Sequence, residues 1–375
     1  QAQTFTNGSA LLPNEYHSGG CVGFTDMDGD GFDDLVVLDG SRTLHILYQG
    51  PDGSFEDFNL GDVSGSNQWG MCVADFDNDG HKDVYSGGSY DGVHVEQITA
   101  PGVSTSIQLE NGSLYMQACN WADIDNDGYL DVFGCHDDAL SRMWKGDENG
   151  NLTPAPGLIP LEDYVLADYS GNDHSGNYGS VFCDFDNDGD IDLFIAKCRQ
   201  FVNDPYDPRR INQLWVNDGN GNFTEEALER GLVFYEQSWT VDFADIDNDG
   251  EDELIFGNAQ GFVHILDWDA TTEGWAEQFH TIDMGGAVKG MEIAQIDDDP
   301  QLEIAVGYNW VSDVGKVKII DGETLLAEAN WSSGISWSHT QWTEGWPYGL
   351  AMGDLDGDDE VEYDVDEMLQ ALYNE

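Results

Sequence analysis

The chain of 375 residues has very few basic side chains. It contains 12 Lys and Arg residues against 74 Asp and Glu residues, which gives a formal net charge of −62. Proteins that bind nucleic acid depend on Lys and Arg to contact phosphate groups. A chain this acidic repels nucleic acid, so nucleic acid is excluded as a partner.

Long apolar runs are also missing. No stretch approaches the roughly 20 apolar residues that a membrane-spanning helix needs, and the first residues lack the basic and apolar segments of a signal peptide. The N-terminal Gln fits a mature end left after signal cleavage. We therefore expect an extracellular or cell-surface protein that does not insert into the membrane.

Familiar catalytic motifs are absent as well. The sequence has no GxSxG, HExxH or P-loop, and its nine His residues are scattered without ligand spacing. The six Cys residues lie in the first 200 positions without CxxC pairs. Cys119 and Cys135 flank one acidic turn, where either a disulfide bond or buried free thiols would fit. These absences favour a protein that is not an enzyme.

What the sequence does contain is an acidic repeat. A nine-residue pattern, DxDxDGxxD or a close relative, occurs seven times, and we number its positions 1 to 9. The copies, named loop 1 to loop 7, are residues 26–34, 75–83, 123–131, 184–192, 245–253, 295–303 and 354–362. They are spaced by 48 to 61 residues, close to the 40 to 50 residues of one propeller blade.

Apolar runs rich in β-formers surround each loop. CVGFT precedes loop 1 and LVVLD follows it, and CVAD and VYSGG flank loop 2 in the same way. A third run such as TLHILYQ comes next, and a fourth often follows a Gly-rich turn. We therefore predict an all-β chain that forms a single domain over 1–375, a seven-bladed β-propeller of four-stranded antiparallel blades.

The two termini are expected to share the last blade. Residues 364–375 match 39–50 in their apolar positions and predict the third strand of blade seven. Residues 3–11 resemble 221–228 and predict its fourth strand. An N-terminal strand in that place closes the ring and removes a free sheet edge.

The loops have the composition of calcium sites. Carboxylates at positions 1, 3 and 5 converge on one point, position 9 adds another, and Gly at position 6 allows the sharp turn. The expected ligands are Asp26, Asp28, Asp30, Asp34, Asp75, Asp77, Asp79, Asp83, Asp123, Asp125, Asp127, Asp131, Asp184, Asp186, Asp188, Asp192, Asp245, Asp247, Asp249 and Glu253.

Loops 6 and 7 depart from this pattern. Loop 6 has Gln295 at position 1 and Pro300 at position 6, which leaves Asp297, Asp299 and Glu303, so we expect it to be weak or empty. Loop 7 has Asp359 in place of Gly. Its expected ligands are Asp354, Asp356, Asp358 and Glu362. The sequence thus predicts about five to seven Ca²⁺ ions.

Two other interpretations of the loops are weaker. An EF-hand begins alike but needs a bidentate Glu at position 12 and flanking helices, whereas position 12 here is never acidic and falls in apparent strands. Solvent-exposed Asp and Gly turns would explain one loop. They do not explain five nearly identical copies.

These residues resemble the FG-GAP/VCBS repeat propellers, which include the calcium-loop propeller of integrin α chains. The segments RRINQLWVNDGNGNFTEEALERGL and QSWTVDFADIDNDGEDELIFGN are similar to the propeller part of ASPIC/UnbV, cartilage acidic protein-like proteins. The resemblance spans essentially the whole chain. It implies secretion, calcium in the loops between strands, and adhesion or ligand recognition. The literal Gly-Ala-Pro signature is absent.

Two segments are candidates for ligand contact. A Trp-rich stretch before loop 7 could stack on sugar rings, or its rings could pack between blades. Its residues are Trp331, Trp337, His339, Trp342 and Trp346. An insertion at 199–211 carries three Arg residues that either contact an anionic ligand or pair with Asp204 and Asp207 nearby.

Three functions remain open from the sequence. The first is a calcium-stabilised recognition or adhesion module that binds a glycan or an extracellular protein. The second is a polysaccharide lyase or hydrolase on a propeller scaffold, because such sites can be built from distant loops. The third is a structural protein whose propellers self-associate into a surface layer or filament.

Overall fold

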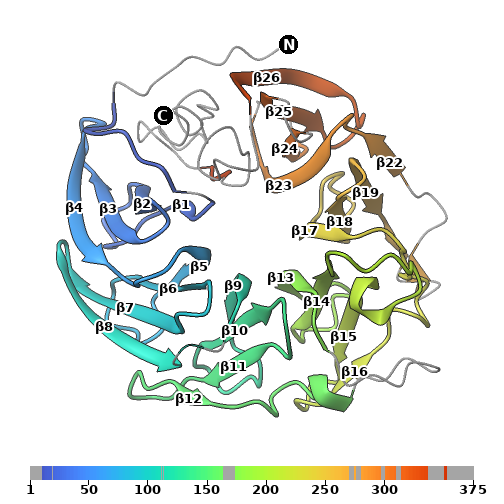
Figure 1. Ribbon diagram of the computed structural model, residues 1–375, viewed down its shortest axis with the longest axis horizontal. Coiled ribbons are helices and arrows are strands. Elements are labelled where there is room, and N and C mark those ends of the chain that lie inside the picture. The colour runs from blue at the N-terminus through green and yellow to red at the C-terminus, as the bar shows by residue number, and fades with distance from the viewer. Residues whose placement is uncertain are drawn as a thin grey trace.

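A computed structural model describes residues 11–18, 20–110, 112, 114–163, 174–269, 274–275, 280–296, 300–309, 314–336 and 350–352. Six antiparallel four-stranded sheets stand around a common centre (Figure 1). The protein is therefore an all-β propeller of four-stranded blades. The segments predicted to form blade seven, 1–11 and 353–375, lie almost wholly outside the described residues, so six of the seven predicted blades are seen.

The first three blades cover residues 22–154. Blade 1 consists of β1 (Val22–Thr25), β2 (Asp34–Asp39), β3 (Thr43–Gln49) and β4 (Phe55–Asp62). Blade 2 consists of β5 (Gln68–Ala74), β6 (Asp83–Gly88), β7 (Val93–Ala100) and β8 (Val103–Glu110). Blade 3 consists of β9 (Met116–Ala122), β10 (Asp131–His136), β11 (Arg142–Lys145) and β12 (Thr153–Pro154).

The next three blades cover residues 177–336. Blade 4 consists of β13 (Asn177–Cys183), β14 (Asp192–Lys197), β15 (Gln213–Asn217) and β16 (Phe223–Glu225). Blade 5 consists of β17 (Ser238–Ala244), β18 (Glu253–Asn258), β19 (Phe262–Leu266) and β22 (His280–Asp283), with a small ribbon of β20 (Trp268–Asp269) and β21 (Gly274–Trp275) beside it. Blade 6 consists of β23 (Ala287–Ala294), β24 (Glu303–Asn309), β25 (Val314–Asp321) and β26 (Ala327–Ser336).

Only short helical turns interrupt the described strands. They are the 3₁₀ turns η1 (Leu161–Asp163) and η2 (Pro208–Arg210), and both lie in the insertions that lengthen blades 3 and 4. Within the described ranges, no helix has the length and apolar character needed to cross a lipid bilayer.

The hydrophobic core lies between neighbouring blades. Each main cluster combines residues of two consecutive blades, such as Phe133 of blade 3 with Ile195 of blade 4, or Phe194 of blade 4 with Phe256 of blade 5. The second strands β6, β10, β14 and β18 are buried along their whole length. A strand that is covered on both faces needs small or apolar residues throughout, which explains the continuous apolar runs after the loops.

The six Cys residues are free thiols, and four of them are buried. In blade 3 the partner of Cys119 across the hairpin is Gly134, and a bulge follows before His136. Cys135 therefore points to the opposite face of the sheet from its neighbour Gly134. Of the two alternatives that the sequence left open, the free thiols are the one found.

Candidate metal centres

Loops 1 to 5 each join the innermost strand of a blade to the second strand. The residue at position 2 of each loop is apolar and at most 2% exposed, so it fixes the loop to the core between blades. These anchors are Met27, Phe76, Ile124, Phe185 and Ile246. Five strand pairs of the same geometry thus present five acidic loops at the same end of the ring.

Backbone amides hold the carboxylate at position 1. In loop 5, both oxygens of Asp245 accept hydrogen bonds, from the amides of Asp249 and Gly250, each at 3.0 Å. Loops 1 to 4 repeat this pattern at 2.7 to 3.1 Å. The Gly at position 6 has φ between 90° and 94° in all five loops. The loop can therefore wrap around its own first side chain.

Substitution of the position-6 Gly should destabilise a loop. Gly250 has φ +94°, and a Cβ there would meet no heavy atom within 4 Å, so backbone strain is the only cost. We expect Gly250→Ala to lower the free energy of unfolding by about 1–3 kcal/mol, measured by urea denaturation in calcium.

Gly157→Ala is the matched control. A Cβ on Gly157 also meets nothing within 4 Å, but no positive φ applies to it. That variant should be neutral or more stable by about 0.4–1 kcal/mol. Equal effects of the two substitutions would contradict the role of φ in loop 5.

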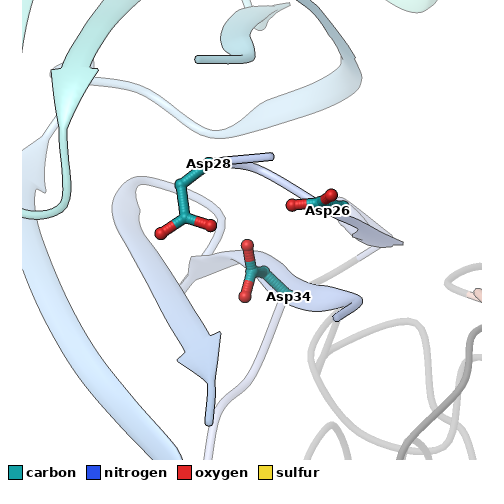
Figure 2. A group of neighbouring side chains, drawn as sticks. All are labelled: Asp26, Asp28 and Asp34. Atoms are coloured by element: carbon teal, nitrogen blue, oxygen red, sulfur yellow. The ribbon is translucent and has the colours of Figure 1, made fainter. Parts of the chain in front are cut away.

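Three carboxyl groups meet in each of the five loops. In loops 1, 2, 4 and 5 the groups at positions 1, 3 and 9 place one oxygen each within 4.8 Å of the others, and in loop 3 positions 1, 3 and 5 do so. Figure 2 shows Asp26, Asp28 and Asp34 converging in this way. Position 5 has a second role, because in each loop it accepts a hydrogen bond from the amide at position 7.

The side chain at position 9 is buried in all five loops, and in loops 2, 4 and 5 one of its oxygens accepts no hydrogen bond. Asp192 is 1% exposed, and its Oδ1 accepts from the amide of Asn217 at 2.8 Å, while its Oδ2 accepts no hydrogen bond. The same holds for Asp83 Oδ2 and Glu253 Oε1 at position 9, and for Asp28 Oδ1, Asp125 Oδ1 and Asp186 Oδ1 at position 3. Buried carboxylate oxygens without donors are costly, and hard oxygen donors in such a group fit Ca²⁺.

Burial raises the pKa of every position-9 carboxyl. Desolvation is the largest cause, nearby carboxylates add to it in each case, and backbone hydrogen bonds oppose it. The pKa rises to about 7 for Asp34, 8 for Asp83, 6 for Asp131, 8 for Asp192 and 9 for Glu253. Without a cation, these groups hold protons at a pH where exposed carboxyls have lost them.

Calcium-free protein should therefore lose stability as the pH rises. These carboxyls have a higher pKa when folded than the unfolded value of about 4. Their contribution is fully present below about pH 4 and is lost as the pH rises through about 6 to 9. We expect a lower melting temperature at pH 8 than at pH 5 in calorimetry without calcium. In millimolar calcium the order should reverse, because the ion replaces the protons; a calcium-free protein more stable at pH 8 would contradict this.

One position on the third strand of each blade also faces the loop. The residue after position 9 pairs with a residue of the third strand, and the position meant here is the next residue along that strand. In blade 3, Val132 follows position 9 and pairs with Trp144, so the position is Lys145. The equivalent residues are Tyr48, Gln97, Lys145, Val216 and Asp267. This position was not predicted from the sequence, although in four loops it lies 22 residues after position 1.

Neighbouring loops are bonded to each other. The side-chain amide of Asn126, at position 4 of loop 3, donates to Asp190 of loop 4 at 3.4 Å, and Asn187 of loop 4 donates to the carbonyl of Gly250 in loop 5 at 3.2 Å. Asn248 of loop 5 donates in turn to the carbonyl of Pro300 in loop 6. These Asn residues have positive φ. The contacts all run from position 4 of one loop to position 6 or 7 of the next.

Several predicted site residues cannot be compared with the structure. Asp297 and Asp299 of loop 6, all ligands of loop 7, and Trp337, His339, Trp342 and Trp346 lie outside the described residues, as does the side chain of Trp331. Glu303 is buried, and its Oε2 accepts from the amide of Ile296 at 2.6 Å, like position 9 elsewhere. In the insertion, Arg209 pairs locally with Asp207 at 2.6 Å, whereas Arg199 bonds Asp138, which follows β10 in blade 3, at 2.6 Å.

The sequence profile of a family described as FG-GAP-like repeat matches residues 26–86, 123–195 and 184–256, together more than half of the chain. Each matched stretch begins at a position-1 Asp and contains two of the acidic loops. The chain is also 23% identical over 346 residues to Cartilage acidic protein 1 of Xenopus tropicalis, covering 78% of this chain and 50% of that protein. It thus spans about half the length of this relative.

Solved structures share the fold at low sequence identity. A mercury-soaked crystal structure of BBS1N in complex with ARL6DN gives a TM-score of 0.51 at 12% identity, over 90% of this chain and 88% of that one. Saccharomyces cerevisiae Sqt1 gives 0.51 at 11% identity, over 89% and 79% of the two chains. At such identities the likeness concerns the fold alone.

Proposed function

Because the chain belongs to the FG-GAP-like repeat family, we propose that it is an extracellular recognition module. In this proposal calcium ions in the loops stabilise a single propeller domain, and the face away from the loops binds a glycan or an extracellular protein. The observation that carries the proposal is the set of five loops whose carboxylates converge around buried oxygens without donors.

The donor set supports calcium in preference to softer metals. Every group in the five clusters is a carboxylate, and none contains His or Cys. Ca²⁺ takes six to eight oxygen ligands, whereas Zn²⁺ and Cu⁺ favour nitrogen or sulfur. Positions 1, 3 and 9 would hold the ion in loops 1, 2, 4 and 5 through their side chains. The position-5 carboxylate and the position-7 carbonyl lie in the same turn and would complete the shell.

The proposal also includes a seventh blade, which the N-terminal and C-terminal segments form together and which contains loop 7. Blade 1 carries a second apolar face, with Leu35, Val37 and Leu47, on the side away from blade 2. Blade 6 likewise buries Ala305, Val317 and Ile319, which are not part of the cluster it shares with blade 5. In the other blades both faces pack against neighbours, so these two faces support one more blade between them.

Exposed aromatic residues mark the proposed recognition face. The loops lie before the second strands, so the connections after those strands lie at the opposite end of each blade. There Phe201 is 94% exposed and Tyr206 is 68% exposed. Tyr206 makes an edge-on contact with Tyr235, with ring centroids 4.9 Å apart. Exposed Tyr and Phe beside Arg residues are typical of binding hot spots.

Binding of the calcium-loaded protein to arrays of glycans and of extracellular proteins tests the recognition proposal. A binder found on either array should lose at least tenfold in affinity when Phe201 and Tyr206 are both replaced by Ser. Leu326→Ser is the matched control, because Leu326 is 67% exposed but follows β25 on the loop side of blade 6. No binder above background, or equal loss in the control, would overturn the proposal.

A further inference from the structure

The residues that face loops 1 to 5 from the third strand differ in charge. Gln97 in blade 2 donates from its side-chain amide to Asp77 Oδ2 at position 3 of loop 2. Tyr48 in blade 1 is buried, and the carboxylates of Asp34 and Asp28 act on its hydroxyl. Val216 in blade 4 offers no polar group. These three neutral side chains leave the charge of their loops unchanged.

Loop 3 differs because a cation lies beside it. The ammonium group of Lys145 bonds Asp125 Oδ2 at position 3 and lies 2.9 Å from Asp127 Oδ2 at position 5. Loop 3 is also the loop in which Asp127 replaces Asp131 in the carboxylate cluster. The lysine thus draws two carboxylates together and places a positive charge next to Asp125, whose Oδ1 remains without a donor.

Loop 5 has the opposite arrangement. Asp267 occupies the third-strand position, directly after Leu266, the partner of Leu254, and its carboxylate acts by charge on Glu253 at position 9 and on Asp247 at position 3. Loop 5 therefore has one more carboxylate beside its ligands than loops 1, 2 and 4. The affinity of oxygen sites for calcium rises with the number of nearby negative charges.

We propose that this third-strand position ranks the loops in their affinity for calcium, with loop 5 the tightest of the five and loop 3 the weakest. The inference rests on the proposed function, since it needs calcium in the loops. Asp267 adds attraction for a divalent cation, whereas Lys145 adds repulsion and occupies carboxylate oxygens that would otherwise face the ion. The five loops share Asp at positions 1, 3 and 5 and an acid at position 9, and the third-strand position makes them unequal from outside these carboxylates.

Calcium titration of the full chain and of two variants tests the ranking. Lys145→Gln gives loop 3 the side chain that loop 2 has naturally, keeping a donor for Asp125 and removing the charge. We expect the weakest binding step to tighten on the order of tenfold in this variant, and the tightest step to weaken on the order of tenfold in Asp267→Asn. Isothermal titration calorimetry and native mass spectrometry at graded free calcium give the affinities and the number of ions.

Two control variants change the same charges far from the loops. Lys316→Gln lies at the end of β25 away from loop 6, and Asp283→Asn lies at the end of blade 5 away from loop 5. Both should give the wild-type titration. Crystals at sub-stoichiometric calcium should show density in loop 5 before loop 3.

The outcomes separate the two proposals. If the wild-type protein takes up no calcium, the proposed function fails and the ranking fails with it. If calcium binds but the Lys145→Gln and Asp267→Asn titrations match the wild type, or loop 3 fills before loop 5, the ranking alone is overturned. Far-UV circular dichroism shows whether a variant is folded. If Asp267→Asn does not fold, the Lys145→Gln titration and the order in which loops fill in wild-type crystals still decide whether the ranking holds.

Discussion

Removal of calcium should lower the melting temperature on the order of 20 °C at neutral pH. A bound ligand stabilises the folded state by about 2.7 kcal/mol when its concentration is 100 times the dissociation constant, and five such loops together reach the size of the whole stability of a typical domain, about 5–15 kcal/mol. In the calcium-free loops, three carboxyl groups place one oxygen each within 4.8 Å of the others, so they either repel one another or take up protons. Differential scanning calorimetry before and after exhaustive chelation measures the change.

Two controls make this result specific. Calcium added back should restore the original melting temperature, and magnesium at the same concentration should restore much less of it, because Mg²⁺ demands a stricter octahedral geometry. A protein that melts at the same temperature with and without chelator would show that the loops do not depend on a cation. The far-UV spectrum would then also remain unchanged.

Phe185→Ala should cost about 3–5 kcal/mol of unfolding free energy. Phe185 is fully buried at position 2 of loop 4, and its ring packs against Trp268 and Trp275 of the ribbon beside blade 5, with centroids 4.9 Å and 5.7 Å away. Arg230 lies over its face at 5.1 Å. The substitution removes the anchor of loop 4 and part of the core between blades 4 and 5, so the urea midpoint should fall in calcium.

The matched control is Phe201→Ala, since Phe201 is 94% exposed. It removes the same side chain and should change the free energy of unfolding by less than about 0.5 kcal/mol. A loss below about 1 kcal/mol for Phe185→Ala would mean that position 2 does not fix the loop to the core.

The repeat could be recognised from the sequence because its chemistry is local. Asp245 and the amides of Asp249 and Gly250 that it binds lie within six residues, so one short pattern specifies both the turn and its cluster of carboxylates. The strands on either side follow from the same repeat, since residues buried between two blades must be small or apolar. That is why the antiparallel four-stranded blades were predicted correctly.

Contacts between distant residues could not be predicted in the same way. Lys145 reaches Asp125 only because β11 pairs with β10 in one particular register, and no pattern within loop 3 specifies that register. In blade 3, the register that pairs Cys119 with Gly134 also decides that Cys119 and Cys135 are not cross-strand partners. Such details depend on sheet geometry, although the spacing of 22 residues from position 1 that four of the loops share would have pointed to Lys145 and Asp267.

The hydrogen bonds between neighbouring loops affect how much the sequence of a single repeat can change. Asn248 donates to a main-chain carbonyl, that of Pro300, rather than to a side chain of loop 6. Every residue type supplies that acceptor, so loop 6 could exchange its first Asp for Gln295 and its Gly for Pro300 without giving up its attachment to loop 5. A repeat whose ligands have been lost by mutation can therefore persist as a spacer in the ring.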